Sequence, residues 1–82
     1  MKILPLHPHI SAYLTKHTLE IKFDKQIRFL KANLRHPGLE VELLEPKHLN
    51  FWSFRVDQKY RAIFIFRDSD TIEIIDVNNH YQ

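Results

Sequence analysis

Apolar residues recur along this chain with two different periods. Between residues 19 and 36 they are spaced four, three and four apart, which places one apolar stripe on a helix: Phe23, Ile27, Leu30 and Leu34. Thr18 is predicted as the N-cap of this helix, and His36-Pro37-Gly38 is predicted to stop it. A shorter helix is predicted from about Ile10 to Lys16, with its apolar side inward.

From residue 39 onward the period changes to two, which indicates β-strands. Strands are predicted at 39–43, 52–56, 61–66 and 71–77, with turns at 57–59 and 67–70. Residues 1–6 predict a short strand at an edge of the sheet, because Pro5 has no N–H to donate to a ladder. The predicted fold class is α+β, a single domain over residues 1–82 in which two N-terminal helices pack on an antiparallel β-sheet.

Composition narrows the classes of protein that fit this pattern. The chain has 82 residues, of which 44% are apolar, and this is ordinary for one small globular domain. It has no cysteine, no apolar run long enough to cross a membrane and no signal-peptide pattern, so we expect a cytoplasmic protein without disulfides. His7 and His9 do not complete the ligand set of a zinc site, and a single glycine excludes a glycine-rich phosphate loop. We therefore expect neither a metal nor another cofactor.

The formal charge is +2, but it is unevenly distributed. Residues 1–36 hold seven Lys/Arg and two acids, whereas residues 37–82 hold five Lys/Arg and eight acids. The basic half is suited to meeting phosphate, although such a cluster is also typical of a solvated helix face.

Two arginines stand out in the predicted strands. Arg61 begins an otherwise apolar strand, where an unpaired guanidinium is costly to bury, so it requires a carboxylate partner or a site for an anion. Arg55 precedes the hairpin turn and faces Arg61 if the strands pair. Two like charges side by side favour an anionic ligand between them.

The order of motifs resembles the RelE/ParE toxin superfamily, and its YoeB-like branch in particular. The resemblance rests on the segments Asn50-Phe51-Trp52-Ser53, Tyr60-Arg61-Ala62-Ile63-Phe64 and the terminal His80-Tyr81, with an acidic turn and an isoleucine-rich strand between the last two. It covers nearly the whole chain. It implies the toxin of a type II toxin–antitoxin pair, with a cognate antitoxin and mRNA on the ribosome as partners.

The resemblance also implies roles for individual residues. Glu45 matches the glutamate that acts as base on the RNA 2′-OH, and His80 matches the acid at the 5′-oxygen. Arg61 and Arg55 match the groups that bind the phosphate. Tyr81 matches a residue that stacks on or orients a base, and Lys59, in the hairpin turn, joins Arg55 as a substrate-binding candidate.

Each of these residues also has a structural interpretation. Glu45 is then a solvated loop acid, Arg61 an internal ion-pair partner of Glu73 or Asp76, and Arg55 an exposed strand residue. His80 and Tyr81 are then ordinary chain-end residues. The aromatic residues of the strands are expected in the core rather than in a base-stacking platform: Trp52, Phe54 and Phe64.

Two other functions fit the same fold. A ParE-like module that poisons DNA gyrase needs no terminal acid, so His80-Tyr81 argues against it. An inactive relative that only binds a partner fits the low overall charge.

Overall fold

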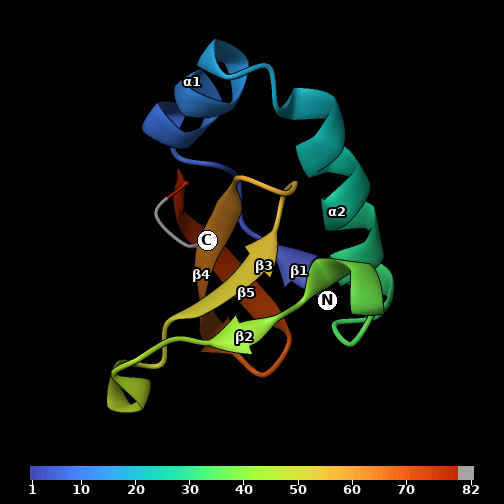
Figure 1. Ribbon diagram of the computed structural model, residues 1–82. Coiled ribbons are helices and arrows are strands. Elements are labelled where there is room, and N and C mark those ends of the chain that lie inside the picture. Colours follow the sequence, from blue (N-terminus) through green and yellow to red (C-terminus); the bar gives the residue numbers. More distant parts are fainter. Residues whose placement is uncertain (80–82) are drawn as a thin grey trace.

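The computed structural model describes residues 1–79 and has the predicted α+β architecture (Figure 1). Its helices are α1 (Pro8–Lys16) and α2 (Glu20–Ala32), followed by two short 3₁₀ helices, η1 (Pro37–Leu39) and η2 (Lys47–Leu49). Its strands are β1 (Lys2–Ile3), β2 (Glu42–Leu43), β3 (Trp52–Arg55), β4 (Arg61–Asp68) and β5 (Thr71–Asn78). In this part of the chain no helix is long and apolar enough to cross a membrane.

The five strands form one sheet in the order β1-β5-β4-β3-β2. Strands β2 to β5 are an antiparallel meander, as the alternating pattern predicts. Strand β1 lies at the edge, as expected, but it pairs with β5 in the parallel direction, so the sheet is mixed rather than wholly antiparallel. A parallel pair needs a long connection, and here the chain passes through both helices and strands β2 to β4 before β5 lies beside β1.

The junction between the helices differs from the prediction at Thr18. This residue adopts a left-handed backbone, with φ of 57°, and Leu19 rather than Thr18 precedes α2. The Leu19 N–H donates to the Leu14 carbonyl at 2.8 Å and the Thr18 N–H donates to the Thr15 carbonyl at 3.2 Å. These bonds form a Schellman motif. Thr18 therefore ends α1 instead of capping α2.

The segment after α2 is less regular than predicted. The helix ends at Ala32, because Asn33 is extended and its side-chain oxygen accepts the Arg35 N–H at 3.0 Å. Leu39 belongs to η1, so only Glu42 and Leu43 of the predicted strand 39–43 pair in the sheet.

The core lies between the helices and one face of the sheet. The α2 residues Phe23 and Leu30 are buried there, and Ile27 and Leu34 of the predicted stripe are partly buried. Phe54 and Phe64 are fully buried, as expected, with ring centroids 6.0 Å apart. Trp52 is only half-buried and packs against this core from β3. The alternation along β3 and β4 leaves Ser53, Arg55 and Arg61 on the opposite face.

Candidate functional site

The opposite face of the sheet carries the polar residues that the sequence analysis singled out. Ser53 pairs with Ile63, and Arg55 pairs directly with Arg61 across β3 and β4. On the other side of β4, Arg61 pairs with Asn78 near the end of β5. Arg61 is therefore an interior position of the sheet, with a polar neighbour on each side.

Arg61 is 9% exposed, which is unusual for a guanidinium. Its Nε donates to the Ser53 Oγ at 3.0 Å, and its Nη2 donates to the Glu40 carbonyl oxygen. Both acceptors are neutral, and among residues 1–79 no carboxylate forms an ion pair with Arg61. The prediction of an internal ion pair with Glu73 or Asp76 is wrong, because Glu73 binds His7 and Arg67 instead and Asp76 binds the Val77 N–H and Asn78.

The surroundings of Arg61 shift its pKa downward. Burial is the main cause, and the charge of Arg55 acts in the same direction. The carboxylates of Glu42 and Glu40 oppose the shift from a distance. An arginine remains protonated in proteins at neutral pH, so the site holds a buried positive charge.

The neighbouring Arg55 is bound in a different way. Its side chain is 42% exposed, and its Nη2 forms an ion pair with the carboxylate of Glu40, which is equally exposed. Lys59 lies exposed in the turn between β3 and β4, where its N–H donates to the Asp57 Oδ1 at 2.8 Å. The fold thus brings Arg55, Lys59 and Arg61 to the same end of the sheet.

That turn is stabilised by Asp57. Burial alone raises the pKa of this carboxyl, but the N–H groups of Lys59 and Tyr60 and the ammonium of Lys22 outweigh it, so the pKa lies below its ordinary value. Lys22 also bonds to the Asp57 Oδ2 at 3.2 Å, which joins α2 to the turn. The turn that carries Lys59 is therefore tied to the helical layer through Asp57.

Glu45 lies away from this group. It is exposed, in the loop between β2 and η2, and its peptide bond with Pro46 is cis. Glu42 pairs with Ser53, and Glu45 lies three residues beyond Glu42. Arg61 pairs with Arg55, which lies two residues from Ser53 in the opposite direction. This conformation does not bring the predicted base to the predicted phosphate site.

His80 and Tyr81 lie outside the described residues. The described part of β5 ends at Asn78, the ladder partner of Arg61.

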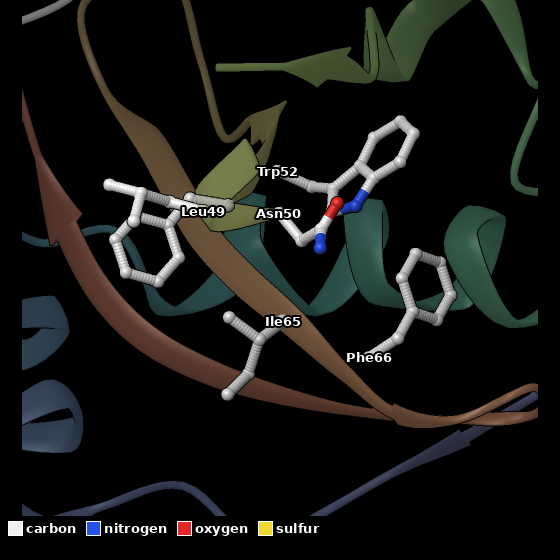
Figure 2. A pocket seen from close by; sticks show the side chains of 6 residues that line it. Leu49, Asn50, Trp52, Ile65 and Phe66 are labelled. Carbon is white, nitrogen blue, oxygen red and sulfur yellow. The ribbon is translucent and has the colours of Figure 1, made fainter. Parts of the chain in front are cut away.

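A hollow of about 490 Å³ lies between the segment from the end of η2 to the start of β3 and the middle of β4. Figure 2 shows Leu49, Asn50 and Trp52 on one side of it and Ile65 and Phe66 of β4 on the other. Phe51 completes the lining that residues 1–79 provide, and none of these lining residues is charged. Phe51 and Leu49 are among the exposed large apolar residues of the described chain. The hollow is suited to an apolar contact rather than to acid–base chemistry.

Sequence reasoning missed two residues of the site, Ser53 and Glu40. The alternation of β3 already places Ser53 on the face of Arg55, and this is the sequence signal that could have found it. In the structure Ser53 is fully buried and its hydroxyl accepts from Arg61. Nothing in the sequence marks Glu40, because its role depends on the irregular segment after η1. Within residues 1–79, no three His, Asp or Glu side chains gather in a way that suits a metal ion.

The fold and this site together define a RelE-like toxin domain. A model of the HigB-like toxin family, RelE-like toxins of type II toxin–antitoxin systems, matches residues 6–80. The chain therefore belongs to this family and is the toxin of a type II toxin–antitoxin system, and the superfamily indicated by the sequence motifs is confirmed. A search of curated proteins gave no significant match.

Solved structures show the same fold. A YoeB/ParE toxin from Agrobacterium tumefaciens is similar with a TM-score of 0.65 and 21% identity, over 99% of this chain and 100% of that chain. The YoeB–YefM toxin–antitoxin complex from Staphylococcus aureus, a heterotetramer, contains a chain with a TM-score of 0.63 and 23% identity, over 99% of this chain and 98% of that one.

Proposed function

We propose that this toxin is a metal-independent endoribonuclease that cleaves mRNA on the ribosome. The observation that carries the proposal is Arg61, a nearly buried guanidinium whose bonds within residues 1–79 all go to neutral acceptors. Such a group is oriented in advance, and its charge is available to an anion. Arg55 and Lys59, at the same end of the sheet, add positive charge for the flanking phosphates.

The reaction that fits these groups is attack by the RNA 2′-OH on the adjacent phosphorus. The 2′-O–P bond forms and the P–O5′ bond breaks, which gives a 2′,3′-cyclic phosphate and a free 5′-OH. Arg61 stabilises the extra negative charge of the phosphorane. No water, metal or cofactor takes part in this step.

Proton transfer requires a base and an acid. We assign the base to Glu45, which takes the 2′-OH proton, and the acid to His80, which gives a proton to O5′. Tyr81 stacks on or orients a base. Because Glu45 and Arg61 lie in opposite directions along the ladder from the Glu42–Ser53 pair, the role of Glu45 requires the loop before η2 to close over bound RNA. A loop that closes on substrate is a common device for assembling such a site.

The partners follow from the family and the reaction. A cognate antitoxin protein is expected to bind and silence the toxin, as YefM assembles with YoeB in the Staphylococcus aureus complex. Translating ribosomes supply the mRNA, which places the activity in the cytoplasm.

The direct test is to add the purified toxin to a translating extract and to map new mRNA 5′ ends. Wild type is compared with His80→Ala and with ribosome-free RNA. Cuts within codons that require both ribosomes and His80 support the proposal. Intact mRNA with active ribosomes contradicts it, and inhibition of DNA supercoiling in a parallel gyrase assay then identifies a gyrase poison instead.

A further inference from the structure

Glu40 adopts a backbone conformation that residues other than glycine rarely adopt. It follows η1 with φ of 46°, in the left-handed region where glycine is the usual residue. A residue held in such a conformation must be fixed by its surroundings, and such residues cluster at functional sites. Here the fixing contacts are the two arginines of the candidate site.

The two contacts differ in kind. The Glu40 carbonyl accepts from the nearly buried Arg61, and this bond is part of the fixed frame of the site. The Glu40 carboxylate binds Arg55 at a half-exposed position, where ion pairs are weak and easily exchanged. Glu40 therefore orients Arg61 with its backbone carbonyl and neutralises Arg55 with its side chain.

The surroundings of the Glu40–Arg55 pair are open and basic. Glu40 lines a hollow of about 460 Å³ together with Arg35 and His36. Arg55 belongs to the lining of a second hollow of about 500 Å³, which includes Lys22, Lys25 and the acidic Asp57, the ion-pair partner of Lys22. The Glu40–Arg55 pair stands where the two meet, and His36 borders both. The Glu40 carboxylate thus occupies the Arg55 guanidinium at an open part of the surface.

We propose that Glu40 is a built-in competitor for RNA: its carboxylate occupies the place on Arg55 that a substrate phosphate takes when RNA binds. The inference rests on the proposed function and identifies Glu40 as the residue that sets affinity for single-stranded RNA. A phosphate displaces the carboxylate from Arg55 while Arg61 keeps its bonds to Ser53 and to the Glu40 carbonyl. Ligands too weakly charged to displace the carboxylate are rejected, which favours a polyanion over a lone anion.

The experiment measures binding of a short 2′-O-methyl RNA, which cannot be cleaved, by fluorescence anisotropy without ribosomes. Glu40→Gln is expected to raise the affinity about threefold, in line with the strength of an exposed ion pair. In an Arg55→Ala background the same change is expected to have no effect. Glu42→Gln is the matched control: it removes an equal charge near Arg61 but breaks no ion pair within residues 1–79. Any gain from it is expected to be equal in both backgrounds.

Glu40→Gly guards against misfolding, because glycine adopts this backbone conformation freely. It is expected to bind RNA as tightly as Glu40→Gln and to resist urea at least as well as wild type. An equal gain from Glu40→Gln with and without Arg55, a loss of affinity, or no binding by any variant overturns the proposal. Because the probe is not cleaved, a failure of the cleavage assay with these binding results intact counts against the proposed function alone.

Discussion

Strand β4 carries an arginine near each of its ends, and the two are bound in opposite ways. Arg61, its first residue, is nearly buried and donates to a hydroxyl and a peptide carbonyl. Arg67 is more exposed, and the carboxylate of Glu73 accepts from its Nε at 2.6 Å. His7 lies on the other oxygen of the same carboxylate, at 2.5 Å. One end of the strand keeps an available positive charge, whereas the other end is neutralised by its own carboxylate.

We interpret this difference as that between a candidate ligand site, at Arg61, and a structural contact, at Arg67. Burying a guanidinium without a counter-ion costs stability, and this cost is the reason to propose that the charge of Arg61 serves a ligand. The Arg67–Glu73–His7 cluster instead joins the segment before α1 to β4 and β5, with both charges satisfied internally. An arginine is therefore better judged by what accepts its hydrogen bonds than by its position in the sequence.

The largest expected effect separates these two arginines directly. Arg61→Ala is expected to lower the rate of mRNA cleavage about 100- to 1,000-fold, because a preoriented donor to the phosphorane is lost. Arg67→Ala removes the same charge from the same strand and is expected to leave the rate within about twofold of wild type. Single-turnover cleavage on ribosomes measures both, with circular dichroism to confirm that each variant folds. Equal losses from the two changes would show that overall charge matters and not the site.

The acid–base partner gives the next largest effect. Glu45→Gln is expected to lower cleavage about 100-fold if the loop before η2 brings this carboxylate to the 2′-OH. Glu42→Gln is the matched change, since Glu42 lies closer to Arg61 along the ladder and acts on it electrostatically. Cleavage that depends on Glu42 and not on Glu45 would move the base to β2, without loop closure.

How far the sequence predicts this site depends on the kind of contact. Alternation placed Arg55 and Arg61 side by side, because the side chains of paired strands follow a fixed period. The positions of residues that follow irregular backbone could not be predicted from the sequence. Glu40 owes its position to η1 and a left-handed backbone, and Thr18 ends α1 instead of capping α2. The alternative partners considered for Arg61, Glu73 and Asp76, were wrong for the same reason: the charged residues of β5 were visible in the sequence, but a peptide carbonyl after η1 was not.

The hydrogen bond that holds Arg61 in place is expected to contribute to the free energy of unfolding. Ser53→Ala removes the buried acceptor of the Arg61 Nε and is expected to lower the free energy of unfolding by about 1–3 kcal/mol. Ser69→Ala, in the exposed turn between β4 and β5, is expected to change it by less than about 0.5 kcal/mol. Urea unfolding at neutral pH measures both. A neutral Ser53→Ala would mean that Arg61 is not held by this hydroxyl in solution.

The smallest expected effect concerns the Arg67–Glu73–His7 cluster at the other end of β4, and it is a loss of stability that appears only at acidic pH. The hydrogen bond from His7 is the main cause that holds the pKa of Glu73 below its ordinary value of 4.5; burial opposes it, and Arg67 adds to the lowering. A lowered pKa in the folded state means that the unfolded chain takes up this proton first as the pH falls. The contribution of Glu73 is thus complete above about pH 4.5 and is lost as the pH falls through the folded pKa.

His7→Gln is therefore expected to raise the pKa of Glu73, as followed by NMR of its carboxyl carbon, and to shift the acid loss of stability to higher pH. Glu73→Gln is expected to remove that part of the pH dependence altogether. Neither change is expected to alter binding of the 2′-O-methyl RNA, because the cluster lies at the far end of β4 from Arg61. If His7→Gln weakened RNA binding as strongly as it shifted this titration, the two ends of the strand would be coupled and the separation drawn between them would not hold.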